Sequence, residues 1–142
     1  MKKLVVMLAL ALSTQLSFAQ TAQVNPIITE FIETQGVKQQ MLTAKESLNE
    51  YILEANKDEF SKEFDKLVDK FIGKLAKVVT SNLKEEEVIG LTKALKDQIP
   101  YEGLSDDKKT KLEESMQILQ TEIGMEMNEL IMQYGNPELF EQ

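Results

Sequence analysis

Ser105 and Lys108 have a spacing in this sequence that could support catalysis. A serine and a lysine three positions apart lie one helical turn from each other, as some enzymes require of a nucleophile and its base. The intervening Asp106 and Asp107 would raise the pKa of the lysine, whereas a base needs a lowered one. We therefore expect Ser105 to be the N-cap of a helix, and we predict no catalytic residue here.

Carboxylates gather in four places: residues 85–87, residues 106–107, residues 113–114, and the run Glu122, Glu126 and Glu129. The dinuclear metal sites of four-helix bundles combine such glutamates with histidines, and the sequence contains no histidine and no cysteine. These absences also exclude the usual zinc ligands and Ser-His or Cys-His nucleophiles. We expect solvated acidic faces, with no metal and no cofactor.

Five lysines lie on one flank of the helix expected at about residues 58–80: Lys62, Lys66, Lys70, Lys74 and Lys77. They span an arc of about 120° at 100° per residue. Lysines four residues apart repel one another, so neighbouring acids or a partner should offset them. Three alternatives follow: a solvated face, internal pairing with glutamates of the later helices, or contact with an anionic envelope component.

The last expected helix contains four of the seven methionines of the chain. Met116 and Met127 fall on its apolar stripe, so we expect them in the core. Met125 and Met132 lie on another side of the helix, seven residues apart. Because methionine is a flexible residue common on adaptable binding grooves, they are candidates for contact with a neighbouring helix, a second subunit or a client.

Helical periodicity runs through every long segment, and no segment alternates as a strand does. Asn25 and Pro26 are typical of the start of a short helix, which Gly36 would end. Further helices are expected at about residues 38–56, 58–80, 82–98 and 106–134, the last followed by Gly135 as its C′ residue. The prediction is all-α: a single bundle of four main helices plus the short N-terminal one, covering residues 20–142, with a frayed leader at 20–24 and a tail at 136–142.

The first nineteen residues have the features of a cleaved signal peptide. Lys2 and Lys3 precede nine apolar residues, Leu4 to Leu12, and Ser17-Phe18-Ala19 forms a cleavage site before Gln20. The apolar run is about half as long as a membrane-spanning helix, and no later segment has eighteen consecutive apolar residues. We expect an exported protein, periplasmic or extracellular, with no stable membrane span after processing.

The charge of the chain argues against nucleic acid as a partner. Losing Lys2 and Lys3 from the 16 basic residues leaves 14 against 24 acidic ones, a net charge of −10. Such an acidic domain has no broad footprint for phosphate backbones. Every basic residue is lysine, so the planar fork that arginine offers to carboxylates and phosphates is missing.

Residues 82–91, Asn-Leu-Lys-Glu-Glu-Glu-Val-Ile-Gly-Leu, follow a long amphipathic helix and precede a long terminal one. In this order the chain resembles, over about residues 38–134, a group of small exported bacterial proteins with an all-helical domain of unknown function. The group usually ends its acidic helix with an aromatic pair and Ser-Pro-x-Gly, where this chain has Ala94-Leu95 and then residues 99–103, Ile-Pro-Tyr-Glu-Gly. The resemblance implies a helical fold, but it supplies no activity and no catalytic residue.

The sequence thus predicts a non-enzymatic binding or interaction module of the bacterial cell envelope. The alternative is a periplasmic holdase-like chaperone with a Met-rich apolar surface on the last helix. The partner is expected to be an envelope protein or an anionic envelope component. The candidate partner-binding residues are Lys62, Lys66, Lys70, Lys74, Lys77, Met125 and Met132.

Overall fold

The computed structural model describes residues 25–140, which form five α-helices. These are α2 (Pro26–Thr34), α3 (Val37–Leu48), α4 (Lys57–Asn82), α5 (Glu85–Asp97) and α6 (Asp106–Tyr134). Three short 3-10 turns, Asn49–Tyr51, Glu54–Asn56 and Pro137–Leu139, complete the regular structure of this range. The all-α prediction is confirmed for residues 25–140; the predicted signal peptide, the leader at 20–24 and residues 141–142 of the tail lie outside the described residues.

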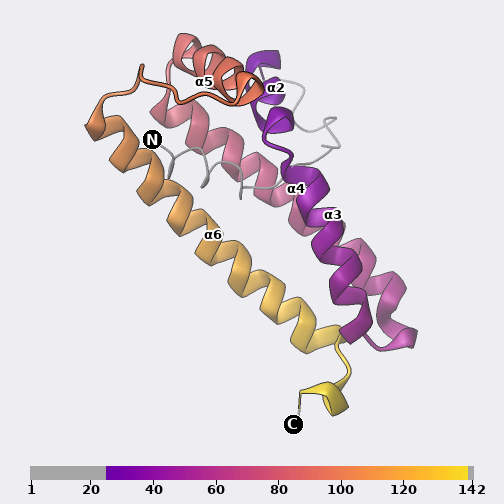
Figure 1. The fold of residues 1–142 in the computed structure, drawn as a ribbon. Helices are drawn as coiled ribbons and strands as arrows, with labels where there is room; N and C mark the ends of the chain where they lie inside the picture. The colour runs from indigo at the N-terminus through magenta and orange to yellow at the C-terminus, as the bar shows by residue number, and fades with distance from the viewer. Residues whose placement is uncertain (1–24, 141–142) are drawn as a thin grey trace.

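The long helices α4 and α6 run antiparallel along each other (Figure 1). α2 packs on α5 and on α4 near one end of this pair, and α3 packs on α4 toward the other. Thus α4 is contacted by α2, α3 and α6, whereas α6 packs mainly on α4.

One apolar core contains residues from all five helices. Helical periodicity predicts one apolar stripe on α4, and eight of its nine residues are buried: Phe60, Phe64, Leu67, Val68, Phe71, Ile72, Leu75 and Val79. The ninth, Val78, is partly buried against the core, and Ala76 is buried beside the stripe. On α6 the buried residues are Leu112, Met116, Leu119 and Ile123. Met127, Leu130 and Tyr134 continue that stripe as partly buried residues packed against the core.

The helix ends follow local sequence rules. The Asn25 side chain accepts a hydrogen bond from the Ile27 N–H at 3.0 Å, and Ser105 Oγ accepts one from the Lys108 N–H at 3.3 Å, so both predicted N-caps are confirmed. Gly36 lies directly after α2 at a φ of 68°, a left-handed conformation that glycine adopts without strain. The start predicted for the next-to-last helix is about three residues early, because α4 continues through Asn82.

The single helix predicted over residues 38–56 is wrong beyond Leu48. Ile52 and Leu53 are extended, at ψ angles of 137° and 136°. Their segment is held by the end of α6: the Leu53 N–H donates to the Tyr134 carbonyl at 3.2 Å, and Tyr51 O accepts from Asn136 N at 2.8 Å. These long-range bonds replace helical ones, and Tyr51 within this segment is exposed.

Gly135 ends α6 in an extended conformation, with φ −69° and ψ 164°, and not in the left-handed form common after helices. Its lack of a side chain is needed for another reason. A Cβ at this position would lie 2.3 Å from the Ile131 carbonyl oxygen and 2.7 Å from a Phe140 ring carbon. The glycine thus allows the chain to turn tightly toward the 3-10 turn that follows.

The α4 stripe gives the first prediction. Replacing the fully buried Phe71 by alanine should lower the free energy of unfolding by about 3–5 kcal/mol, because the ring leaves a cavity in a core that cannot fully collapse. Urea unfolding followed by circular dichroism measures the loss. Ile118→Ala on the exposed side of α6 is the matched control and should change the free energy by less than about 0.5 kcal/mol. Equal effects of the two substitutions would contradict the assigned core.

Candidate functional site

Ser105 and Lys108 do not face each other as a nucleophile and base. The serine oxygen is used by the backbone of α6, and Lys108 Nζ lies 2.5 Å from Glu87 Oε1 of α5. Burial alone would raise the pKa of Glu87, but the hydrogen bonds from Lys108 Nζ and from the Lys84 N–H lower it below the ordinary value. The pair of Lys108 and Glu87 therefore joins α5 to the first turn of α6.

The acidic residues that cluster in the sequence make separate contacts in the structure. Glu85 accepts a hydrogen bond from the Asn25 side chain at 3.2 Å, which links the starts of α2 and α5. Glu122 and Glu126 contact lysines of α4. Within residues 25–140, no three acidic side chains are grouped closely enough to hold a metal ion.

The lysine flank, defined as Lys62, Lys66, Lys70, Lys74 and Lys77, lies along α4 beside α6. Lys70 Nζ contacts Glu126 at 2.7 Å and Lys74 Nζ contacts Glu122 at 2.5 Å, both across to α6. Lys62 and Lys66 pair with glutamates one turn earlier on α4, at 3.7 and 2.6 Å. Lys77 is exposed and has no ion pair within the described range. Of the three sequence-based alternatives, these contacts favour internal pairing for Lys70 and Lys74.

The hydrogen bond between Lys74 and Glu122 raises the pKa of the lysine and lowers that of the glutamate. The glutamate's contribution to stability is therefore present above its unfolded-state pKa and is lost as the pH falls through its folded pKa. The lysine's contribution is present below its own unfolded-state pKa and is lost as the pH rises through its folded one. The pair stabilises the contact of α4 with α6 across the neutral range.

The methionines of α6 divide as the sequence predicts. Met116 is buried and Met127 partly buried, whereas Met125 is 57% and Met132 83% exposed. Ile118 belongs with the exposed pair at 62%, although sequence reasoning missed it. The signal that could have found it is its spacing, because Ile118, Met125 and Met132 follow one another at intervals of seven residues.

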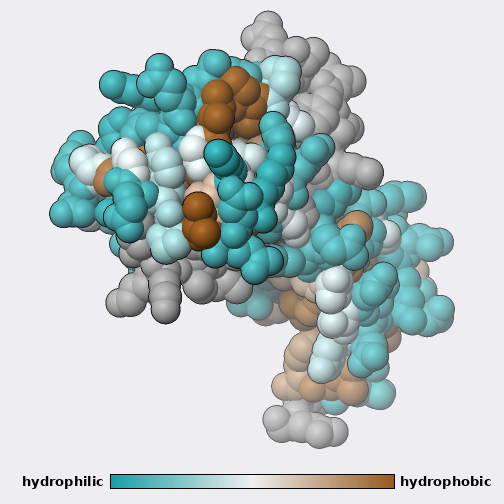
Figure 2. All heavy atoms as spheres, turned by 45° about the horizontal axis from the view of Figure 1, so that its top comes forward, coloured by the Kyte–Doolittle hydropathy of each residue, from teal (hydrophilic) through white to brown (hydrophobic). Residues whose placement is uncertain are grey.

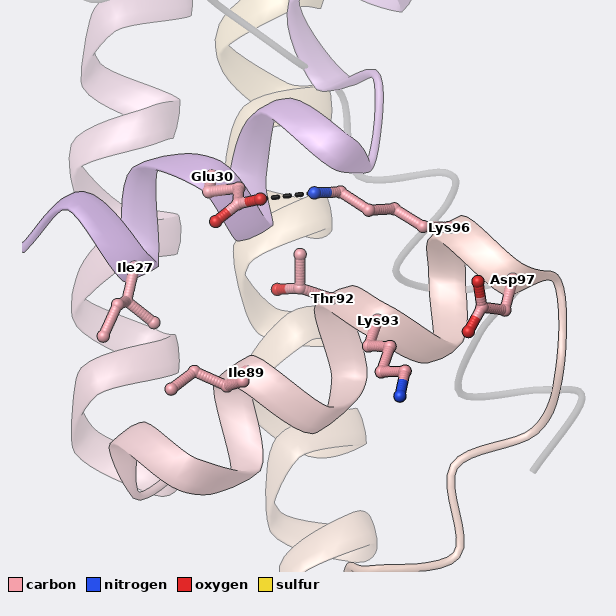
Figure 3. A pocket seen from close by; sticks show the side chains of 7 residues that line it. All are labelled: Ile27, Glu30, Ile89, Thr92, Lys93, Lys96 and Asp97. Atoms are coloured by element: carbon pink, nitrogen blue, oxygen red, sulfur yellow. Dashed lines mark hydrogen bonds and ion pairs between the residues drawn. The ribbon is translucent and has the colours of Figure 1, made fainter.

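A hollow of about 220 Å³ lies between α2 and α5 (Figure 3). Ile27 and Ile89 face it from the two helices, and an ion pair between Glu30 and Lys96 crosses one side. A second hollow of about 190 Å³ lies between α4 and α6, where Lys66 and Lys70 line it together with Glu126 and Glu129. Pockets that enclose small molecules usually measure about 300–1,000 Å³, so both hollows are smaller than such pockets.

Figure 2 shows the end of the molecule that α5 covers. Hydrophobic side chains form separate small areas there within a mainly hydrophilic surface. Isolated apolar residues of this kind are ordinary on protein surfaces. The aligned residues of α6 are a different case, because they follow one line along a helix.

No protein-family model, curated protein or solved structure matches this chain. The resemblance to small exported helical proteins therefore stays a prediction. In the range 25–140, no helix combines the length and apolar character required to cross a bilayer.

The lysine flank gives the second prediction. Replacing Lys70 and Lys74 together by glutamate should lower the melting temperature, because four acidic groups would then face one another between α4 and α6. Adding Glu122→Lys and Glu126→Lys should restore much of the loss, and high salt should shrink it. Lys77→Glu is the control and should leave the melting temperature nearly unchanged.

An unchanged melting temperature in the double variant would contradict internal pairing. The alternative of an anionic partner makes a separate prediction for the same protein. If the lysine flank binds anionic liposomes, the double variant should lose that binding at low salt.

Proposed function

We propose that the protein is an exported, non-enzymatic binding module of the bacterial cell envelope that binds its partner through the outer face of α6. We define this outer face by three residues of α6: Ile118, Met125 and Met132. The observation that carries the proposal is the exposure of these three large apolar residues, 62%, 57% and 83%, along a single line.

The apolar line offers three exposed side chains to a partner. Each keeps most of its surface in water, and burying one would contribute at most about 1.5–3 kcal/mol before the cost of association is subtracted. Two of the three are methionines, whose unbranched chains adapt to the shape of a partner. The contacts of Ser105 and Lys108 support the non-enzymatic part of the proposal. Ser105 is a helix cap, and Lys108 is paired with Glu87.

The proposal takes the mature protein to be one helical domain from Gln20 onward. α3 to α6 would be its four main helices and α2 its short N-terminal helix. The single apolar core to which all five contribute supports one domain. Export rests on the charged, apolar and small-residue segments of residues 1–19.

A holdase-like chaperone is the second candidate function. It is favoured by the same exposed pair, Met125 and Met132, because flexible apolar side chains accept many unfolded sequences. The two functions differ in what they bind: a binding module has a defined partner, whereas a holdase has many clients.

The export proposal gives the third prediction. Protein purified from the envelope of its own cells should have the intact mass of residues 20–142, with or without the loss of ammonia that accompanies cyclisation of Gln20. The measurement is mass spectrometry of the undigested protein, and a matched sample with the Ala19→Pro substitution should keep the longer chain. Finding Lys2 and Lys3 on the purified wild-type protein would contradict export by a cleaved signal peptide.

The binding proposal gives the fourth prediction. A photo-crosslinking residue placed at Met125 and activated in living cells should give one discrete crosslinked product, whereas the same residue at Ile89, exposed on α5, should give none. A broad smear of products at Met125 alone would favour the holdase. An absence of products at Met125, or the same products at both positions, would contradict both functions.

A further inference from the structure

We infer that the outer face of α6 binds a basic amphipathic helix of another protein. This inference rests on the proposed function and adds the chemistry of the partner. It depends on two features of the face: its apolar line and the acidic residues beside that line.

The apolar line has the geometry of a seam between two helices. Ile118, Met125 and Met132 lie seven residues apart, so they span four turns of α6, or about 21 Å. At 100° per residue the three side chains fall within an arc of about 40°, on the side opposite the buried Met116 and Ile123. Seven residues is the coiled-coil repeat, whose seam has two apolar positions per repeat, and this face offers one of the two.

Acidic side chains border the line along its whole length. Ile118 has Glu114 one turn before it and Glu122 one turn after it. Glu129 lies one turn after Met125 and one turn before Met132. A partner bound along the apolar line would therefore have a carboxylate near each of its three apolar residues.

Two of these carboxylates, Glu114 and Glu129, have no ion pair within residues 25–140. Glu122 is paired with Lys74, and Glu129 lines the hollow that Lys66 and Lys70 also line. The one lysine on this side of α6, Lys111, is paired with Asp107 at 3.0 Å. The face thus combines apolar anchors with net negative charge, which favours a partner that places lysines or arginines on both sides of an apolar stripe.

The same charges disfavour the other occupants. A second copy of the chain would bring its own Glu114 and Glu129 against the first pair if the two outer faces met. An anionic membrane would be repelled by the same carboxylates. The long α4 has the converse pattern, lysines beside an apolar stripe, but that stripe is buried in the core and is not free to dock.

Two synthetic helical peptides test this inference on the purified native protein. Both have about 21 residues with leucine at the same heptad positions, and they differ only in lysine or glutamate at the flanking positions. In fluorescence anisotropy the lysine peptide should bind at least about ten-fold more tightly than the glutamate peptide at low salt, and the ratio should shrink at high salt.

Substitutions then locate the site and the charge. M125Q/M132Q keeps the net charge and should weaken the lysine peptide by about ten-fold or more, because two apolar anchors are lost. I89Q/I99Q removes two exposed apolar side chains elsewhere, at 50% and 54%, and should leave peptide binding unchanged. E114K/E129K should reverse the preference toward the glutamate peptide.

Three results would overturn the inference. Failure of both peptides to bind would show that the face does not accept a helix. Equal weakening by M125Q/M132Q and I89Q/I99Q would place peptide binding elsewhere. Equal affinity for the two peptides, lost in M125Q/M132Q, would remove the basic partner. In that last case the proposed function would stand, since crosslinking at Met125 judges it independently of the partner's charge.

Discussion

The apolar contact between α4 and α6 is the interaction on which the rest of this structure depends. α4 has a broad buried face that includes Phe60, Phe64 and Phe71. α2, α3 and α6 all pack against α4. α6 has a narrower stripe that packs mainly on α4. α2 and α3 also pack on α4, and α5 packs on α2. On the opposite side of α6, Ile118, Met125 and Met132 are therefore exposed within residues 25–140.

Ion pairs add little free energy to this contact. Lys70–Glu126 and Lys74–Glu122 join successive turns of the antiparallel helices α4 and α6. Ion pairs this open to solvent contribute little to stability. Two lysines of the lysine flank, Lys70 and Lys74, pair with glutamates of α6, whereas Lys62 and Lys66 pair with glutamates of α4 itself. Beside the exposed line of α6, Glu122 is paired in this way, and Glu114 and Glu129 have no ion pair within residues 25–140.

Most of the helical pattern could be predicted from the sequence because it is local. The stripe of α4 and the N-caps Asn25 and Ser105 depend on residues within one or two turns. The helix predicted over residues 49–56 was wrong for the opposite reason. The Leu53 N–H donates its hydrogen bond to the Tyr134 carbonyl, which is distant in the sequence. The pairing of the lysine flank likewise required the register of two helices. The exposed methionines could be predicted from their position on the helix. The role proposed for their acidic neighbours required the structure, which shows that this side of α6 is exposed within residues 25–140.

Methionine oxidation followed by mass spectrometry tests the central claim most directly, because the chain supplies its own controls. In the purified protein, brief peroxide treatment should oxidise Met125 and Met132 fastest, Met127 more slowly, and the buried Met41 and Met116 slowest. In intact envelopes, protection should appear at Met125 and Met132 and leave the order of the others unchanged. Oxidation of Met125 and Met132 at the same rate in both preparations would contradict a partner on the outer face of α6. Rapid oxidation of Met116 in the purified protein would contradict the packing of α4 on α6 itself.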